Sequence, residues 1–200
     1  MERSESGKIM DYMTDQTIVL TGDLVILTNP DDSHASFFYE LASNEQLRYY
    51  SSDEPFQKME PEEFIYYYLT RLMSATRHYL PFVVMDKDTG HPVGQIHAGR
   101  IDCDNKNCMI GFEIHPRYQR RGYGSDAVET ILDYLFFDLK LHRVGAEVYE
   151  YNIASRKVLE KLGFSREGKL TEWLYRKEKY WDKLLYGILR HEWINSVNDE

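Results

Sequence analysis

Short apolar runs alternate with polar residues along much of the chain, and turn residues separate the runs. An alternation with a period of two, bounded by turn residues, predicts β-strands. The predicted strands and hairpins occupy residues 17–28, 81–85, 92–101, 108–115, 143–152 and 164–193, the last being a long β excursion that ends in a strand over 183–193. Turns at 86–91 and 102–107 join three of these strands into consecutive antiparallel hairpins.

Other segments carry apolar residues at the spacing of a helix. Residues 35–47 are compatible with one or two short helices, and residues 48–56 predict a loop. A helix is predicted to begin near Pro61, which suits the first helical position, and its apolar stripe is Phe64, Ile65, Tyr68, Leu69, Leu72 and Met73. The amphipathic run at 125–139 predicts a longer helix that packs on the sheet.

These elements predict one α+β domain. The polar residues 1–16 are expected to form a mobile tail, and residues 17–197 are expected to fold together because neither a repeat nor a linker interrupts them. A chain of 200 residues is long enough to bury a sizeable core, and a hydrophobic fraction of 42% argues against disorder.

Composition narrows the classes of function. The formal charge of -9 disfavours nucleic-acid binding as the main role, because phosphate contacts need a positive surface, although residues 117–121 form a local basic patch.

No apolar run approaches the roughly 20 residues that span a bilayer, and no signal-peptide segment is seen, so we expect a cytoplasmic protein with no membrane partner. Cys103 and Cys108 match no zinc or redox spacing and are expected to be free thiols, and no metal is expected. Monomer and homodimer both remain open.

The most informative stretch lies between the strand at 108–115 and the helix at 125–139. It is Gln119-Arg120-Arg121-Gly122-Tyr123-Gly124, called the glycine loop below. Glycine lets the backbone approach a ligand closely, and the first turn of the following helix has amide groups without intrahelical acceptors. Those amides, the helix dipole and the two arginines predict a seat for a phosphate or diphosphate. The loop lacks the third glycine of a dinucleotide-binding fold and the signature of a P-loop.

A second motif begins at Asn152, which opens a short helix over residues 153–162 that Gly163-Phe164 ends. This spacing, and the pattern Gln-x-x-Gly-x-Gly after Glu-Ile-His-Pro, resemble the two signatures of the GNAT N-acetyltransferase superfamily. The segment IGFEIHPRYQRRGYGSDAV looks most like the RimJ/RimL branch, named for N-terminal acetylation of ribosomal proteins. The resemblance covers residues 108–164 and the closing YWDKLLYGILRHEW, and it is weak over the first hundred residues.

The resemblance implies a mixed, mostly antiparallel sheet flanked by helices, whose fourth and fifth strands splay apart into a V-shaped cleft. Acetyl-CoA would be the cosubstrate, with its pantetheine arm beside residues 112–115 and its diphosphate on the amides of residues 120–125. Asn152 would hydrogen-bond the arm, and Arg156 could reach a phosphate. The residues implied to contact acetyl-CoA are Ile114, His115, Gln119, Arg120, Arg121, Gly122, Tyr123, Gly124, Ser125, Asn152 and Arg156.

Acetylation of an amine requires further groups. The amine must lose its proton, and Glu113, a carboxylate in an otherwise apolar strand, is the candidate base. Ser155 is the candidate donor to the departing thiolate, because Leu159 stands where many GNAT enzymes have a general-acid tyrosine. Tyr149 and Tyr151 remain alternatives for that role.

We therefore expect an N-acetyltransferase that moves acetyl directly to an amine through a tetrahedral intermediate, since neither motif contains a cysteine. The acceptor is left open among a protein N-terminus, a polyamine, an aminoglycoside antibiotic and another small amine. Two other classes fit the same residues. One is a non-catalytic acyl-CoA-binding sensor that kept the cleft, and the other is an RNA- or ribosome-associated module that uses the arginines of the glycine loop.

Overall fold

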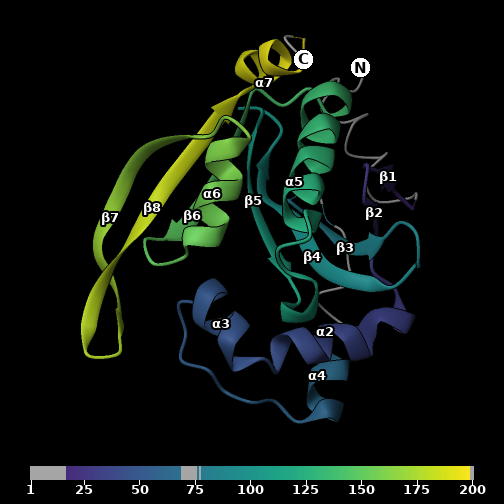
Figure 1. Cartoon of the computed structure of the whole chain (residues 1–200), viewed down its shortest axis with the longest axis vertical. Helices are drawn as coiled ribbons and strands as arrows, with labels where there is room; N and C mark the ends of the chain where they lie inside the picture. The colour runs from purple at the N-terminus through teal and green to yellow at the C-terminus, as the bar shows by residue number, and fades with distance from the viewer. Residues whose placement is uncertain (1–16, 69–75, 77, 199–200) are drawn as a thin grey trace, which may run out of the picture.

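The polypeptide forms an eight-stranded sheet with the order β1-β2-β3-β4-β5-β6-β8-β7 in the computed structural model (Figure 1). The structure describes residues 17–68, 76 and 78–198, so the predicted tail and the stripe residues Leu69, Leu72 and Met73 lie outside the described residues. The strands are β1 Val19–Thr21, β2 Val25–Thr28, β3 Tyr79–Asp86, β4 Pro92–Asp102, β5 Asn107–Ile114, β6 Arg143–Tyr149, β7 Ser165–Arg176 and β8 Lys179–Leu189.

One parallel pair among these strands determines the shape of the cleft. β5 pairs parallel with β6 only as far as Ile110, which lies opposite Ala146. Beyond that point β5 keeps its register with β4 as far as Ile114, and β6 keeps its register with β8 as far as Tyr149, so the two strands part. The predicted splay is confirmed, and it falls between the fifth and sixth strands because the N-terminal segment forms a hairpin of two strands.

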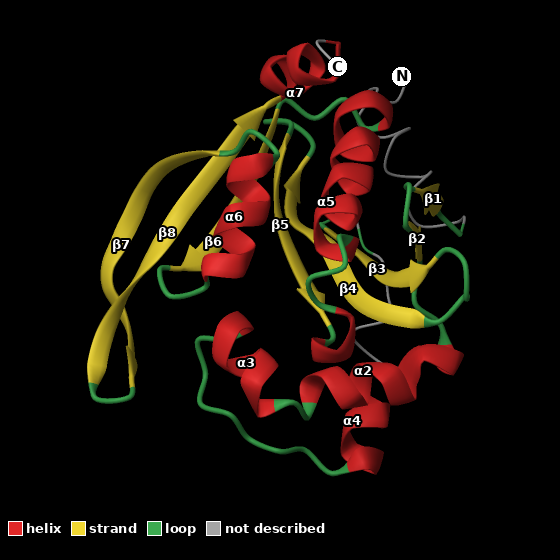
Figure 2. Ribbon diagram, viewed as in Figure 1, coloured by secondary structure: helices red, strands yellow, loops and turns green. Residues whose placement is uncertain are grey.

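Helices flank the sheet and close one end of it (Figure 2). They are α2 Ala35–Ala42, α3 Glu45–Ser51, α4 Pro61–Tyr67, α5 Tyr123–Asp133, α6 Ile153–Lys161 and α7 Arg190–Asn198. α2, α3 and α4 gather at the end of the sheet where β5 and β6 part, and the long β7–β8 hairpin runs down beside α3 (Figure 1). No helix in the described part of the chain is long and apolar enough to cross a bilayer.

The apolar face of α5 packs on the sheet, as the sequence predicted. Its fully buried members, together with those of the π-helical turn Tyr134–Asp138 that continues it, are Ala127, Val128, Ile131, Leu132, Leu135 and Phe136. Burying one large side chain of this kind stabilises a fold by about 1.5 to 3 kcal/mol, so this face fixes where the helix sits. α5 begins at Tyr123, ahead of the predicted residue 125, because Gly122 adopts the left-handed conformation that ends the loop.

Further predicted boundaries are wrong. Residues 48–51 continue α3 instead of forming a loop, because the Asn44 side chain caps the helix at 3.0 Å from the Leu47 amide, and Leu47 is buried. The closing strand stops at Leu189 instead of running to residue 193. Glu192 accepts the Leu189 amide at 2.8 Å, and α7 begins there.

Candidate active site

The glycine loop turns into α5 through a left-handed residue. Gly122 is the N-cap with φ +93°, and a Cβ added to it would lie 2.8 Å from Leu24 Cδ1. No side chain caps the helix at this end. The first-turn amides therefore remain available to a ligand, at the end of the helix where the dipole favours an anion. Arg120 and Arg121 are exposed beside them.

Side chains behind the loop hold it against the rest of the fold. The Gln119 amide donates to the Ile114 carbonyl at 2.9 Å and ties the loop to the end of β5. The Tyr123 hydroxyl donates to Asp86 in the β3–β4 turn. The buried Asp126 carboxylate accepts backbone amides of the β1–β2 turn at 2.8 to 3.0 Å, from Asp23, Leu24 and Val25. The loop is thus shaped by contacts that leave its outer face open.

One feature of the loop fits a bound diphosphate. Ser125 Oγ is buried and has no hydrogen-bond partner within the described part of the chain, which is unusual unless a ligand supplies one. The structure brings residues 119–125 together at one helix terminus, and their contact with acetyl-CoA stays a prediction.

Three adjoining cavities open along the splay and toward α2 and α4. The central cavity, about 510 Å³, lies between the parted strands and residues 50–54. The α6 cavity, about 350 Å³, lies between α3, the end of β5 and the start of α6. The α4 cavity, about 520 Å³, lies beside α2 and α4. The central and α6 cavities share Tyr50, Ser51, Phe112, Glu113, Asn152 and Ser155. Glu113 lines all three and stands at their junction.

Glu113 is held from β4 and α3. Its Oε2 accepts a hydrogen bond from Gln95 Nε2 at 2.8 Å, and its Oε1 lies 3.8 Å from Arg48 Nη1. Gln95 is directly opposite Glu113 in the β4–β5 register. His97 is on the same face of β4, and desolvation lowers its pKa although the nearby carboxylate of Glu113 acts in the opposite direction. A neutral imidazole and an amide therefore face the cleft beside this carboxylate.

Asn152 and Ser155 lie at the start of α6, on the other wall of the cleft. Asn152 Oδ1 accepts the Ser155 amide at 3.2 Å, so Asn152 is the cap of this helix. The Ser155 hydroxyl makes no hydrogen bond within the described part of the chain and is not needed for capping. Its side chain is therefore available for another role at the cavity wall.

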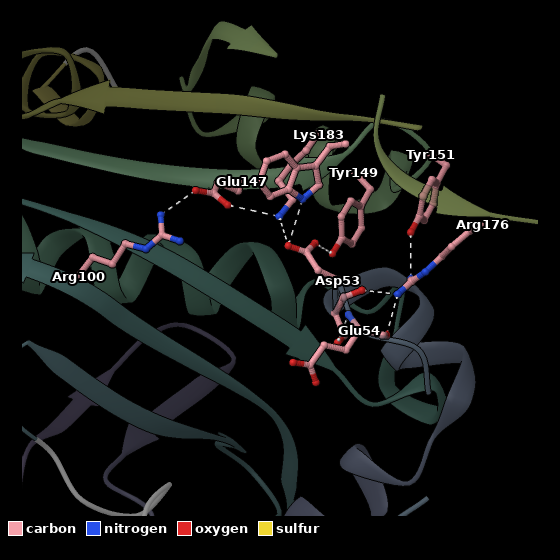
Figure 3. A network of polar contacts seen from close by, with 10 residues as sticks. Asp53, Glu54, Arg100, Glu147, Tyr149, Tyr151, Arg176 and Lys183 are labelled. Carbon is pink, nitrogen blue, oxygen red and sulfur yellow. Dashed lines mark hydrogen bonds and ion pairs between the residues drawn. The ribbon is translucent and has the colours of Figure 1, made fainter. Parts of the chain in front are cut away.

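The two alternative tyrosines are engaged elsewhere (Figure 3). The Tyr149 hydroxyl donates to Asp53. Burial is the main cause that raises the pKa of Tyr149, and the Asp53 carboxylate is the second. The Tyr151 hydroxyl donates to the Tyr49 carbonyl at 2.7 Å and accepts from Arg176 at 3.2 Å. Burial raises the pKa of Tyr151 to about 12. Both phenols are committed to structural contacts, which leaves Ser155 the better candidate for the thiolate donor.

His115 and Arg156 do not face the cleft as expected. The His115 amide donates to the Val93 carbonyl at 2.9 Å, and its ring nitrogens are occupied by the Arg117 amide at 3.3 Å and by Glu40 Oε1 at 3.1 Å. His115 is buried by these contacts and lines neither the central nor the α6 cavity. Its ring is therefore turned away from these two cavities, and a contact of its backbone with acetyl-CoA stays a prediction.

Arg156 donates to the Glu150 carbonyl at 3.1 Å and lies 3.9 Å from Glu160. Glu160 in turn accepts the hydroxyl of Tyr186 on β8 at 2.7 Å, so this side of α6 faces the sheet. Arg156 lines none of the three cavities, but its Nε is buried without a hydrogen-bond partner in the described part of the chain, so a contact with a phosphate stays a prediction.

Sequence reasoning missed several residues of the cleft. The polar residues Gln95 and His97 alternate with Gly94, Ile96 and Ala98 in the predicted strand, and this pattern could have placed them on one face. Arg48 and Asp53 fell in a predicted loop and carried no such signal.

Comparison with known proteins identifies the family. The model of the acetyltransferase (GNAT) domain matches residues 25–165, and the chain belongs to this family. It is an N-acetyltransferase by class, as predicted. The uncharacterized N-acetyltransferase YnaD of Bacillus subtilis (strain 168) is 29% identical over 157 residues, which cover 78% of this chain and 87% of YnaD.

Solved structures share the fold. The spermidine N-acetyltransferase of Vibrio cholerae in complex with CoA and spermine aligns with a TM-score of 0.76 and 23% identity, covering 86% of this chain and 99% of that chain. RimL, a ribosomal L7/L12 alpha-N-protein acetyltransferase in complex with coenzyme A, aligns with a TM-score of 0.76 and 19% identity, covering 86% and 98%. The GNAT-like fold is confirmed.

Proposed function

We propose that this protein transfers the acetyl group of acetyl-CoA directly to a cationic amine, with Glu113 as base and Ser155 as donor to the departing thiolate. One observation carries the proposal. Glu113 on β5 and Ser155 on α6 line the same two cavities, from opposite walls of the splay. An acid-base pair placed across a cleft that opens between two parted strands is what transfer between two bound molecules requires.

Several features support a seat for acetyl-CoA, which supplies an activated acyl thioester when bound. The open first-turn amides of α5 and the exposed Arg120 and Arg121 suit a diphosphate. The edge of β5 beyond Ile110 has no strand partner on the β6 side, so its backbone groups can pair with an amide-bearing arm. The Asn152 side chain lines the same space.

The charge of the central cavity favours a cationic acceptor. Its lining carboxylates are Asp53, Glu54, Glu113 and Glu147, against the cations Arg48 and Lys183. An excess of carboxylates raises the local concentration of a protonated amine. Holding that amine neutral costs about 1.4 kcal/mol for each unit by which its pKa exceeds the pH, and Glu113 is placed to accept the proton.

Direct transfer is also supported by the positions of the cysteines. Neither Cys103 nor Cys108 lines the central or the α6 cavity. Cys108 is buried, and burial raises its pKa to about 12, so its thiol is a poor nucleophile. An acyl-cysteine route has no candidate at the cleft.

The proposal is tested by measuring coenzyme A binding by calorimetry and thiol release from acetyl-CoA with a panel of amines. The panel holds spermidine, a pentapeptide with a free N-terminus and an aminoglycoside. Binding together with release that depends on an amine is the expected result. Binding without release for any amine in the panel would favour the acyl-CoA sensor and overturn the enzymatic proposal. Mass spectrometry of acetylated products from cell extract then identifies the natural acceptor.

A further inference from the structure

One wall of the central cavity is held in place by side chains that reach it from the β7–β8 hairpin. This wall segment, residues 49–54, runs from the last turn of α3 into the loop that follows. Its residues Tyr50, Ser51, Ser52, Asp53 and Glu54 line the central cavity. Figure 3 shows Asp53 of the segment facing Lys183 of the hairpin, and the backbone of Glu54 beside Arg176.

Arg176, at the end of β7, binds the segment through its backbone. Its guanidinium donates to the carbonyls of Tyr49 and Ser52, to the carbonyl of Glu54 at 3.1 Å and to the Tyr151 hydroxyl. The last carbonyls of a helix have no intrahelical donor, and the fixed fork of an arginine can satisfy several at once. The guanidinium also lies 5.4 Å from the ring centre of Tyr49.

Asp53 makes a second set of contacts, with the same hairpin and with Tyr149 of β6. Its carboxylate accepts hydrogen bonds from Lys183 at 2.7 Å, from the Trp173 indole at 3.1 Å and from the Tyr149 hydroxyl. Desolvation raises the pKa of Asp53, but these hydrogen bonds outweigh it and hold that pKa below its ordinary value. Asp53 therefore stays ionised and bound to the hairpin instead of being free to meet an incoming amine.

Glu54 differs from Asp53 in this respect. Arg176 holds its backbone carbonyl, while its exposed carboxylate has no partner within the described part of the chain and points away from the network (Figure 3). Glu54 lines both the central and the α4 cavities. It is thus the carboxylate of this wall that remains available to a cation.

We propose that Glu54 recognises a positively charged group of the acceptor and that Arg176 is the positioning residue that fixes Glu54 at the cavity wall. This rests on the function proposed above. The glycine loop makes none of these contacts: its anchors are Ile114 and Asp86. Loss of Arg176 should consequently weaken acceptor binding and leave acetyl-CoA binding unchanged.

The test compares Arg176→Gln with Arg166→Gln, an exposed arginine on the same strand that lines none of the cavities. Steady-state kinetics are measured with spermidine and with the pentapeptide as acceptors. Removing charge-assisted hydrogen bonds should raise the KM for either acceptor about tenfold or more in Arg176→Gln, with less than about a twofold change for acetyl-CoA. Glu54→Gln should raise the acceptor KM without disturbing the wall segment.

Hydrogen exchange provides a second measurement that does not depend on turnover. Amides of residues 49–54 should exchange faster in Arg176→Gln, whereas those of residues 122–130 should not. Trp173→Phe keeps an aromatic side chain but removes the indole N–H that donates to Asp53, so it should shift the exchange in the same direction by less.

Kinetics and exchange equal to those of Arg166→Gln would overturn the inference. So would an equal rise of both KM values, since that marks a general loss of structure. If the wild-type protein acetylates no amine, the proposed function fails, while the exchange experiment still decides whether Arg176 holds the wall.

Discussion

The cofactor side and the acceptor side of the cleft are built over very different distances along the chain. The proposed diphosphate seat is a continuous stretch, residues 119–125, and its ligand groups are backbone amides of one helix end. The acceptor side depends on the wall segment, which is held by side chains far away in sequence. Arg176 and Tyr49 are 127 residues apart, and Lys183 and Asp53 are 130 residues apart. Local sequence alone can specify the first kind of site, whereas only the folded chain assembles the second.

The difference also implies that the two sides can vary independently. The seat needs glycines and a helix end, so few substitutions are tolerated there. The wall needs complementary side chains on α3, β6, β7 and β8, and several combinations could fill that space with different charge. Substitutions should therefore separate into those that change binding of acetyl-CoA and those that change binding or turnover of the amine.

The largest effect is expected on the cofactor side, from Gly122→Val. A β-branched residue is strained at φ +93°, and its Cβ would meet Leu24 Cδ1 at 2.8 Å, so the loop that presents the first-turn amides would have to shift. Calorimetry should detect no binding of coenzyme A, a loss of at least about a thousandfold, equivalent to about 4 kcal/mol.

Gly90→Val is the matched control for this change. Gly90 also has a positive φ, +68°, but a Cβ there meets nothing within 4 Å. Both variants should lose some stability from backbone strain, and only Gly122→Val should lose coenzyme A. Retained binding in Gly122→Val would remove the glycine loop from the cofactor site.

The next effect is expected at the junction of the cavities, from Glu113→Gln. The amide cannot take the proton of the amine, so kcat should fall by about 10²- to 10⁴-fold, most strongly at low pH where more of the amine is protonated. Coenzyme A binding should stay the same. The exposed Glu178, in the β7–β8 turn, gives the control variant Glu178→Gln. Equal pH–rate profiles for the two variants would exclude Glu113 as the base.

The fold was predictable where short-range patterns determine it. The β3–β4 and β4–β5 hairpins have turn residues between alternating runs, and the α6 helix has Asn152 at its start and Gly163, with φ +84°, at its end. The continuation of α3 through residue 51 was missed, because its polar sequence gave no helical stripe and its contacts come from the distant hairpin.

The candidate site was predictable to the same extent. Glu113, Ser155 and the glycine loop were predicted from motifs between residues 108 and 164. The structure brings Glu113, Ser155 and Gln119 to the lining of one cavity, and their roles stay predictions. His115 and Arg156 were carried over by position in a motif, but their side chains are held by Glu40 and by Glu150 and Glu160. Residue spacing does not report which way such side chains turn.

A smaller effect is expected from Ser155→Ala. Asn152 caps α6 through the Ser155 amide, so removing the hydroxyl should change the free energy of unfolding by less than about 0.5 kcal/mol. Loss of a donor to the thiolate should lower kcat about tenfold to a hundredfold. Asn152→Ala should show the opposite pattern in stability, losing about 1 kcal/mol with the cap. If the kcat of Ser155→Ala equals that of the wild type, Ser155 is not the thiolate donor and another group must have this role.

The smallest effect concerns His97 on the acceptor side, and it is seen in stability. Desolvation lowers the pKa of His97 in the folded protein, so below about pH 6.5, the ordinary value, the unfolded chain binds a proton that the folded chain does not. Stability from this site is therefore complete above pH 6.5 and is lost as the pH falls, by at most about 1.4 kcal/mol per unit. Urea unfolding between pH 7.5 and 5.5 should show a shallower loss in His97→Gln than in the wild type or in His191→Gln, whose side chain is exposed. Parallel curves for all three proteins would mean that His97 binds a proton equally well in the folded and the unfolded chain. That result would contradict a neutral His97 beside Glu113.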